Sequence, residues 1–239
     1  MKTTAFITDI HFAEDDVSGL GVNQEKNWRI ILDDITQRGD IDEIIFGGDI
    51  GSAAAHDMFF ASLNNCGIGY KVILGNHDTF EDVRKHIQTV SESDNELFYS
   101  YDDAGFRYIF LDTSTSSFSA DQFNRLKEKI VTELPITIFI HHPVLRVDSI
   151  VDKLYPLKGR DEIKSLLRSA KNDITIFCGH LHNEDTATEG NIRQYLTPSA
   201  SYQALKHTED IITDINEFGY RIIKFGKEIH TEIIKFEKS

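Results

Sequence analysis

The sequence predicts an α/β layered fold, and three observations support this prediction. Short runs rich in β-branched residues alternate with longer amphipathic segments rich in charged residues, a pattern typical of strands that alternate with covering helices. Hydrophobic residues form 40% of the 239-residue chain, which suffices to bury a sizeable core. Because no repeat, low-complexity tract or Pro/Gly/Ser-rich linker interrupts the chain, we expect a single domain over residues 1–239.

Nine segments are predicted to be strands, and five of them end in residues whose side chains can bind a metal ion. These five are residues 5–8, 43–46, 71–74, 136–140 and 174–177. The other four are residues 106–113, 192–196, 220–225 and 228–236. Gly226-Lys227 joins the last two segments, and a glycine in the first position of a two-residue turn favours a tight hairpin.

Five further segments carry helical spacing or good helix formers, namely residues 23–37, 53–64, 80–90, 120–133 and 161–170. We expect them to connect the strands and to flank the sheet. Trp28 and the pair Phe59-Phe60 lie at helical positions and are expected to pack in the core. Residues 205–218 contain apolar patches, which would suit either a homodimer contact or a helix packed on the core.

The charge balance argues against binding to nucleic acid or to an anionic membrane. The formal net charge is -14, from 39 acidic residues against 25 Lys and Arg, and the acidic surplus is spread along the chain. A protein that follows a phosphate backbone needs a basic stripe to replace the condensed counterions, and the sequence has none. The acidic surface is expected to favour solubility.

The remaining composition points to the cytoplasm as the expected compartment. Cys66 and Cys178 form no close-spaced pair, so we expect two reduced core thiols instead of a disulfide framework or a zinc knuckle. The N-terminus reaches the charged Asp9 too soon for the apolar region of a signal peptide. No apolar stretch approaches the roughly 18–20 residues that a membrane-spanning helix needs.

Polar side chains that can bind a metal follow the five strand segments named first above, which are residues 5–8, 43–46, 71–74, 136–140 and 174–177. Residues two apart in an extended chain point the same way, so Asp9 and His11 would converge if the chain stays extended. In open α/β sheets the functional crevice lies beyond the carboxyl ends of the strands, so these side chains are expected to meet there. The candidate metal ligands are Asp9, His11, Asp49, Asn76, His141, His180 and His182.

Each of these fragments alone has an ordinary explanation. Asp-x-His occurs by chance, Asp49 after two glycines suits a turn, and Asn76 suits an Asx-turn. Their shared position at strand ends nevertheless favours one joint metal site. Four imidazoles, two carboxylates and one amide exceed one closed tetrahedral site and include no thiolate, which argues against a structural zinc.

The number of ligands favours two divalent metal ions. If Asp49 bridges them, each ion has four protein ligands and room for water, and such oxygen and nitrogen ligands suit manganese, iron or zinc. Two ions about 3.5–4 Å apart would hold a bridging hydroxide and clamp the oxygens of a phosphate during in-line displacement. Two-metal aminopeptidases are the competing interpretation.

His77 favours phosphate chemistry over peptide hydrolysis. It follows the candidate ligand Asn76 directly, so its imidazole would lie beside the metal ions and could stabilise the developing charge or protonate the leaving oxygen. Asp78 is expected to orient the other ring nitrogen of His77. The alternative role for His77 is a hydrogen bond within its own loop.

In their order, these residues resemble the motifs of the calcineurin-like metallophosphoesterases. The motifs stand in this sequence as Asp9-Ile10-His11, Gly48-Asp49, Gly75-Asn76-His77-Asp78, His141 and Gly179-His180-Leu181-His182. The resemblance implies a two-sheet β-sandwich flanked by helices. It also implies one metal ion held by Asp9, His11, Asp49 and His182, and a second held by Asp49, Asn76, His141 and His180.

Further segments resemble the bacterial cyclic AMP phosphodiesterase branch of this family, also called class III cyclic nucleotide phosphodiesterases. They are Leu20-Gly21-Val22-Asn23, His141-His142-Pro143, residues 197–203 and Gly219-Tyr220-Arg221, so the resemblance covers nearly the whole chain. It implies hydrolysis of a 3',5'-cyclic nucleotide such as cyclic AMP by a metal-bridging hydroxide, with His77 assisting. The implied substrate contacts are His11, Asp49, Asn76, His77 and His182.

Two departures from the family bear on the substrate. After Asp49 the chain reads Ile50-Gly51-Ser52-Ala53, without the additional Asp or Asn that many relatives carry. Residues 144–158, which are expected to overhang the site, have a composition of their own. A broader phosphatase or diesterase for another small phosphorylated metabolite is therefore the alternative, and a non-catalytic binding module is a further one. His142 is expected to contact a metal ligand or the nucleotide instead of binding a metal ion itself. The remaining histidines are expected to lie at the surface, namely His56, His86, His207 and His230.

Overall fold

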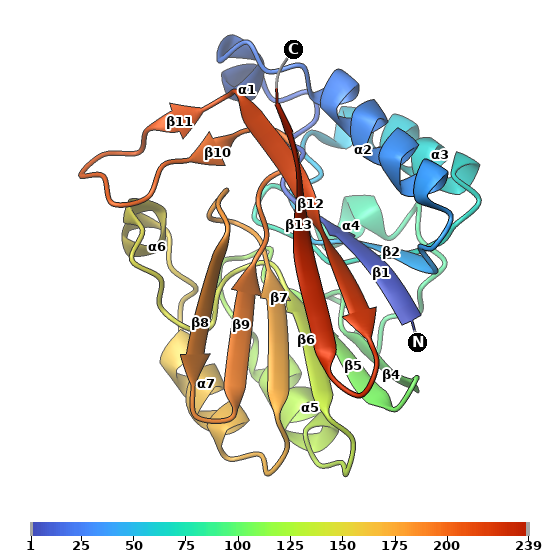
Figure 1. Cartoon of the computed structure of the whole chain (residues 1–239). Helices are drawn as coiled ribbons and strands as arrows, with labels where there is room; N and C mark the ends of the chain where they lie inside the picture. The colour runs from blue at the N-terminus through green and yellow to red at the C-terminus, as the bar shows by residue number, and fades with distance from the viewer. Residues whose placement is uncertain (1, 238–239) are drawn as a thin grey trace.

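The computed structural model describes residues 2–237, and two β-sheets face each other within it (Figure 1). Five strands form one sheet in the order β13-β12-β1-β2-β3, six form the other in the order β4-β5-β6-β7-β9-β8, and β10 pairs with β11. The two-sheet sandwich flanked by helices is thereby confirmed. The bounds are β1 (Lys2–Ile7), β2 (Glu43–Phe46), β3 (Gly69–Val72), β4 (Tyr99–Asp103), β5 (Phe106–Leu111), β6 (Ile136–Ile140), β7 (Ile174–Cys178), β8 (Asp185–Glu189), β9 (Ile192–Leu196), β10 (Gln203–Ala204), β11 (Thr213–Asp214), β12 (Glu217–Phe225) and β13 (Ile229–Glu237).

Helices cover the outer faces of both sheets. Two of them, α2 (Gln24–Arg38) and α3 (His56–Asn65), lie beside β1 and β2 (Figure 1). The six-stranded sheet is covered by α5 (Ala120–Lys129) and α7 (Arg160–Arg168). None of the helices within residues 2–237 has the length and apolar character needed to cross a membrane. The shorter helices are α1 (Asp15–Gly19), the 3-10 turn η1 (Ala53–Ala55), α4 (Phe80–Val83) and α6 (Ile150–Leu154).

Side-chain alternation along the central strands divides the core into two parts. Phe6 of β1 lies 5.5 Å from Phe139 of β6 and 6.3 Å from Phe177 of β7, measured between ring centroids, so aromatic rings fill the space between the sheets. The neighbours Ile138 and Ile176 point to the other face and pack with apolar residues of α5 and α7. Both faces of these strands are buried, which explains their nearly continuous apolar sequence.

The structure corrects one expected helix and contradicts another that the sequence had left as an alternative. The helix expected over residues 80–90 is only the single turn α4, because the following stretch contains the β-branched Ile87, Thr89 and Val90, which favour helix less. Residues 205–218 contain the loop between β10 and β11, the strand β11 and the start of β12. The core-packed helix considered for this segment is therefore wrong. The short or polar strands β4, β8, β10 and β11 were not predicted.

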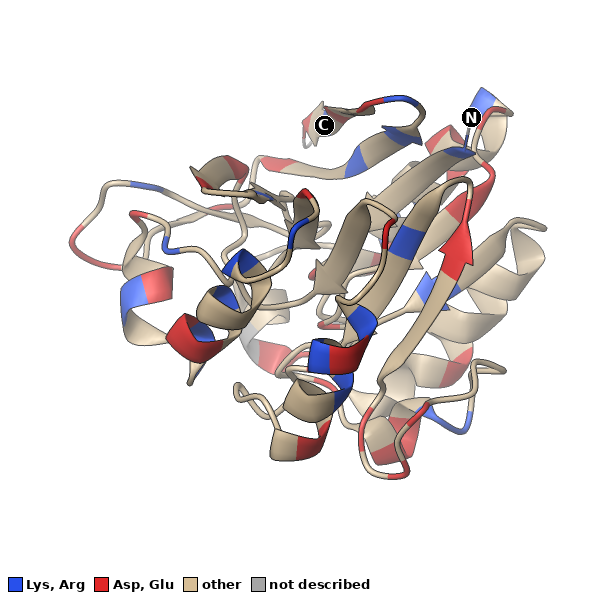
Figure 2. Ribbon diagram, turned by 90° about the horizontal axis from the view of Figure 1, so that it is seen from below, with Lys and Arg blue, Asp and Glu red and all other residues tan. Residues whose placement is uncertain are grey.

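Charged residues of both signs are interspersed over the surface. In Figure 2, Lys and Arg lie among Asp and Glu on the helices and strand ends, and the described residues show no basic stripe in this view. Exposed pairs join some of them, such as Arg125 and Asp121, whose nearest charged atoms lie 2.8 Å apart. Pairs of this kind contribute little to stability because water screens them.

Candidate metal centre

The loops after five strands meet at one end of the two sheets. The strands β1, β2 and β3 run parallel, as do β5, β6 and β7, so their carboxyl ends lie at the same edge. Backbone hydrogen bonds of 3.0 Å tie the loops together, from Asp9 to Gly48 and from Gly179 to His141. The residues brought together or lining the same cavity are Asp9, His11, Asp49, Asn76, His141, His180 and His182.

The backbone at these residues is not extended. Among the candidate ligands, φ is 59° at Asp9, 55° at His11, 57° at Asp49, 68° at His180 and 49° at His182. Residues other than glycine adopt this left-handed conformation rarely, and such strain concentrates at functional sites. The two-residue spacing on an extended strand is therefore the wrong reason for the convergence of Asp9 and His11, although their side chains do converge, with Nε2 of His11 3.9 Å from Oδ1 of Asp9.

Two glycines leave room for the buried carboxylates. A Cβ atom on Gly75 would meet the carboxylate of Asp49, and one on Gly179 would meet that of Asp9. Thr8 donates a hydrogen bond of 2.6 Å to Oδ2 of Asp9, and a backbone N–H donates one of 2.9 Å to Oδ1 of Asp49. The backbone N–H of His180 also donates to the two oxygens of Asp9, at 3.1 and 3.2 Å. Oδ1 of Asp9 and Oδ2 of Asp49 are the oxygens that face the imidazoles.

The imidazoles of the GHxH motif and of His141 are each held through one ring nitrogen. His141 and His182 donate from Nδ1 to backbone carbonyls at 2.8 and 3.1 Å. His180 differs, because its Nε2 donates to the carbonyl of Tyr155 at 2.9 Å. A partner of this kind fixes the tautomer and leaves the other ring nitrogen available as a metal ligand.

These free nitrogens and carboxylate oxygens form a close set of donors. Nε2 of His141 lies 3.2 Å from Oδ2 of Asp49, and Nε2 of His182 lies 3.3 Å from Oδ1 of Asp9. Nε2 of His11 lies 3.0 Å from Nε2 of His182. Nε2 of His141 is buried, and despite its 3.2 Å approach to Asp49 it makes no hydrogen bond of suitable geometry to the described atoms. A buried polar atom left in this way fits a metal ligand.

The electrostatics of the set favour a cation. Burial raises the pKa of Asp9, but His182 and His141 outweigh it and lower the pKa to about 2. Burial likewise raises the pKa of Asp49, yet His141 holds it well below the usual range. Burial lowers the pKa of His141, but the two carboxylates raise it to about 10. Two ionised carboxylates in one buried site need positive charge beside them, so this oxygen and nitrogen donor set fits divalent metal ions.

The structure corrects the expected role of Asp78. Its two carboxylate oxygens accept hydrogen bonds of 2.8 to 2.9 Å from the backbone N–H groups of Asp49, Ile50 and Gly75. Burial and the charge of Asp49 raise the pKa of Asp78 to about 7. Asp78 therefore joins the loops after β2 and β3 and does not orient His77.

Glu14, which the sequence patterns did not single out, is the acid that contacts His77. Its Oε1 lies 2.9 Å from Nδ1 of His77, and its Oε2 lies 2.9 Å from Nδ1 of His11. Burial raises the pKa of Glu14, but the two imidazoles lower it to about 2. The hydrogen bond to Glu14 is the main reason that the pKa of His77 rises to about 9. The only signal in the sequence was an acid three residues after His11.

Two histidines outside the candidate set are also buried. His142 shares a hydrogen bond of 2.9 Å with Oγ1 of Thr113, and its ring centroid lies 4.0 Å from that of His180. His142 thus contacts the neighbours of the metal centre, and its ring could join two candidate ligands at one ion. His56 is only 2% exposed, so its expected place at the surface is wrong.

Five of the candidate ligands, namely His11, Asp49, Asn76, His180 and His182, line a cavity of about 430 Å³. Asn76 and His77 are exposed at its edge. Two elements, α6 and the β10–β11 hairpin, lie side by side at this end of the molecule and form the far wall (Figure 1). Of the segment 144–158, which was expected to overhang the site, Val151 and Tyr155 line this cavity. Besides the candidate ligands, Glu14 and His77, the cavity is lined by Ser116, Val151, Tyr155, Leu181, Tyr202, Ala204 and Ile211.

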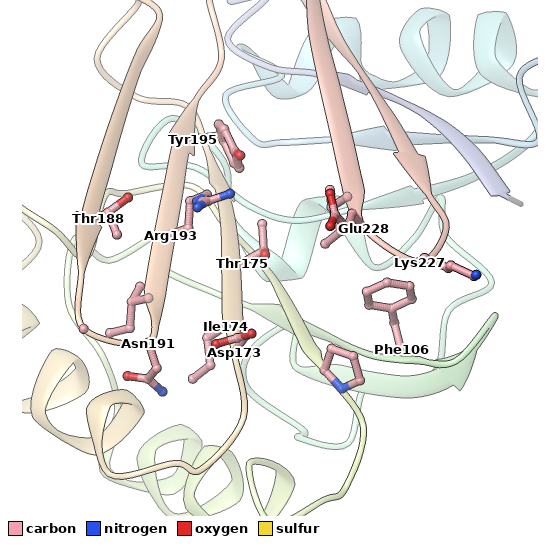
Figure 3. A pocket seen from close by; sticks show the side chains of 14 residues that line it. Phe106, Asp173, Ile174, Thr175, Thr188, Asn191, Arg193, Tyr195, Lys227 and Glu228 are labelled. Carbon is pink, nitrogen blue, oxygen red and sulfur yellow. The ribbon is translucent and has the colours of Figure 1, made fainter.

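A second groove, of about 340 Å³, lies at the opposite end of the sheets (Figure 3). Arg193 and Tyr195 of β9 line one side of it, and Glu228 of the β12–β13 turn lines the other. Asp173, just before β7, lies at its lower end. None of the candidate ligands lines this groove, because they follow the carboxyl ends of the strands.

Three comparisons with known proteins agree with this geometry. The model of the calcineurin-like phosphoesterase family matches residues 2–184. A probable cyclic nucleotide phosphodiesterase of Fibrobacter succinogenes is 29% identical over 239 residues, covering 98% of this chain and 93% of that protein. A probable glycerophosphodiester phosphodiesterase of Arcobacter nitrofigilis is 28% identical over 175 residues, covering 68% and 64%. A solved dimetal phosphatase of Danio rerio shares the fold, with a TM-score of 0.70, 15% identity and coverage of 100% of this chain and 99% of that one.

Proposed function

Because the chain belongs to the calcineurin-like phosphoesterase family and is a metal-dependent hydrolase of phosphoric esters, we propose that its substrate is a 3',5'-cyclic nucleotide. Cyclic AMP, hydrolysed to 5'-AMP, is the first candidate. The name of the Fibrobacter succinogenes relative supports this choice. The family match sets aside the alternative of a non-catalytic binding module. The observation that carries the choice of substrate is the composition of the cavity wall.

The metal ligands are assigned from the motifs and from the donor set. The assignment is supported by the ligand atoms of Asp9, His11 and His182, which lie within 4.8 Å of one another. Manganese, iron or zinc suits these ligands. When bound, two such ions supply Lewis-acid activation of water and of the phosphate oxygens. The first ion is assigned to Asp9, His11, Asp49 and His182, and the second to Asp49, Asn76, His141 and His180.

The part of the cavity wall formed by Ser116, Val151, Tyr155, Leu181, Tyr202, Ala204 and Ile211 is uncharged and partly apolar. Tyr155 is 58% exposed and Ile211 is 42% exposed, so both offer surface to a bound molecule. None of the described residues that line this cavity is a lysine or an arginine, so a second phosphate group on the substrate would find neither of these cations there. The cavity therefore favours a substrate with one phosphate and a flat, uncharged remainder, as in a cyclic nucleotide.

His77 is proposed to protonate the leaving oxygen. Its side chain is 39% exposed and lines the cavity beside Asn76. Its Nδ1 is occupied by Glu14, so Nε2 is the atom that can meet the substrate. A positioned general acid of this kind typically contributes roughly 10²–10⁴-fold to a rate. The proposed substrate contacts are His11, Asp49, Asn76, His77 and His182.

A glycerophosphodiester is the second candidate substrate, and the Arcobacter nitrofigilis relative favours it. Its glycerol is polar and flexible, so it would gain little from contact with Tyr155 and Ile211. The two candidate substrates therefore differ in how strongly their binding should depend on this part of the wall. Replacing Tyr155 by alanine should weaken binding of the cyclic nucleotide and leave that of the glycerophosphodiester nearly unchanged.

The test is a substrate panel with protein loaded with manganese or iron. The panel contains cyclic AMP, cyclic GMP, glycerophosphocholine and bis(p-nitrophenyl) phosphate, and Asp49→Asn at equal metal loading is the control. Fast turnover of cyclic AMP that is lost in the control would support the proposal. Preference for glycerophosphocholine would select the second candidate. Turnover of the aryl ester alone would leave the two-metal chemistry intact and overturn both substrates.

A further inference from the structure

The carboxylate of Glu14 joins two imidazoles that come from different loops. Its two oxygens each lie 2.9 Å from an Nδ1 atom, one in His77 and the other in His11. The side chain of Glu14 is 13% exposed. The rings of His11 and His77 lie edge to face, with centroids 4.7 Å apart and an interplanar angle of 84°. One carboxylate thus fixes the orientation of both rings.

The backbone keeps this carboxylate free for the imidazoles. Glu14 directly precedes α1 but does not cap that helix with its side chain. The preceding Ala13 has a φ of 54°, and Phe12 pairs with Gly51 in the loop after β2. Two other acids lie close to His77. Oδ1 of Asp49 accepts a hydrogen bond of 2.9 Å from the backbone N–H of His77 and not from its ring, and both oxygens of Asp78 are occupied by backbone N–H groups. Glu14 is therefore the acid placed to hold His77.

We propose that Glu14 is a positioning residue that holds His77 as the proton donor to the leaving oxygen of the substrate. This inference rests on the phosphodiesterase function proposed above. With Nδ1 bound to Glu14, Nε2 is the ring atom left to face the cavity that His77 lines. A fixed partner on one ring nitrogen orients the imidazole and determines that the other nitrogen exchanges the proton.

The proton balance of the step is simple. The oxygen of a water molecule forms a bond to phosphorus, and one proton of that water is released to solvent. The bond between phosphorus and the leaving oxygen breaks, and its electron pair stays on that oxygen. His77 reacts as the imidazolium: the leaving oxygen takes the proton from Nε2, Nδ1–H stays on Glu14, and the resulting imidazole recovers a proton from solvent after the product leaves.

The test compares two diaryl phosphates whose leaving groups differ strongly in basicity. Bis(p-nitrophenyl) phosphate releases p-nitrophenolate, which departs without a proton, whereas diphenyl phosphate releases the far more basic phenolate. In Glu14→Gln a single acceptor oxygen remains for two imidazoles. We expect kcat on diphenyl phosphate to fall by roughly tenfold or more, and kcat on bis(p-nitrophenyl) phosphate to fall by less than about threefold.

Two further variants test whether Glu14 acts on the rate through His77. His77→Ala should show the same selective loss on diphenyl phosphate. The double variant Glu14→Gln/His77→Ala should lose little more than His77→Ala alone, because a positioning residue acts through the group that it holds. Glu25→Gln changes an exposed glutamate in the first turn of α2 and is the matched control, expected to leave both rates unchanged.

Nitrogen-15 NMR of the metal-free protein gives a readout that does not depend on activity. The Nδ1 resonance of His77 should report a hydrogen-bonded N–H in the wild type and lose that signature in Glu14→Gln. The signature should remain in Glu25→Gln. An unchanged His77 spectrum in Glu14→Gln would overturn the proposal.

The kinetic outcomes separate this inference from the proposed substrate. Equal losses on both diesters in Glu14→Gln, with lowered metal content, would show that Glu14 acts through His11 and would overturn the proposal. No effect of His77→Ala on either diester would remove the proton-donor role, and the inference with it. A selective loss on diphenyl phosphate in a protein that does not hydrolyse cyclic AMP would support the role of Glu14 and refute the cyclic nucleotide assignment.

Discussion

Replacing Arg160 by leucine should destabilise the protein through the segment that overhangs the metal centre. Nη1 of Arg160 lies 2.5 Å from Oδ1 of Asp152, and the other oxygen of Asp152 accepts a hydrogen bond of 3.2 Å from the backbone of Val147. The side chains of Arg160 and Asp152 are only 8% and 3% exposed. Arg160→Leu therefore leaves a buried carboxylate without its cation.

The expected loss follows from this burial. Removing one partner of a buried ion pair costs about 3–5 kcal/mol. In a protein of this size each kcal/mol lowers Tm by about 2–4 °C, so Tm should fall by about 6–20 °C. Activity at a temperature where the variant stays folded should also fall, because Tyr155, which lies between the two charged residues in sequence, holds His180 through its carbonyl.

Thermal unfolding followed by circular dichroism measures the change in Tm, and urea unfolding measures the change in free energy. Arg146→Leu is the matched control, because Arg146 pairs with Asp161 at 3.2 Å but both side chains are more than 60% exposed. Its loss should stay below about 1 kcal/mol. The double variant Asp152→Asn/Arg160→Leu should recover part of the loss, since it buries no charge. Equal Tm values for Arg160→Leu and Arg146→Leu would refute the reasoning.

Four other perturbations should give distinct results. Gly75→Ala places a Cβ against the carboxylate of Asp49, so metal affinity measured by calorimetry should fall by about 10-fold or more; an unchanged affinity would contradict the packing argument. Tyr155→Ala should raise KM for cyclic AMP by about tenfold with little change in kcat, as expected from the loss of about 1.4 kcal/mol of contact energy; an equal change with glycerophosphocholine would argue against a nucleobase site. A chelator should lower Tm, because the ions bind only the native state; a Tm independent of metal would count against the ligand assignment. Burial lowers the pKa of His56, so the unfolded chain binds more protons near the ordinary pKa of about 6.5 and stability should be lost as the pH falls below that value. Between about pH 7.5 and pH 5.5, urea unfolding should show a larger loss in the wild type than in His56→Gln, and equal losses would exclude His56 as the cause.

The place of the candidate site could be predicted from the sequence because strand ends can be recognised. Apolar runs that stop at Asp9, at Asp49 and at His141 require the next side chains to gather at one edge of a parallel sheet. The conformation of those residues could not be predicted in the same way. The left-handed backbone at Asp9 and His11 depends on hydrogen bonds to the loop after β2, and such long-range contacts leave no periodic pattern.

The partners of His77 were unpredictable for the same reason. Proximity in sequence favoured Asp78, but its oxygens satisfy three backbone N–H groups that converge only in the folded chain. Glu14 reaches His77 because the loop after β1 lies against the loop after β3. The weakly apolar strands β4 and β8 were missed because they lie at the edges of a sheet, where one face needs little burial.

Tyr155 contacts the candidate metal centre and the cavity through different atoms, so the proposed substrate contact and the proposed metal site can be tested separately. Its carbonyl accepts a hydrogen bond of 2.9 Å from Nε2 of His180, while its side chain is 58% exposed in the cavity wall. A substitution at Tyr155 changes the wall and leaves the carbonyl in place. An insertion or deletion between Asp152 and Arg160 would move the carbonyl and disturb the orientation of His180. Substrate preference can therefore change through side chains of this segment, whereas its backbone, held by the buried ion pair, is constrained by the metal centre.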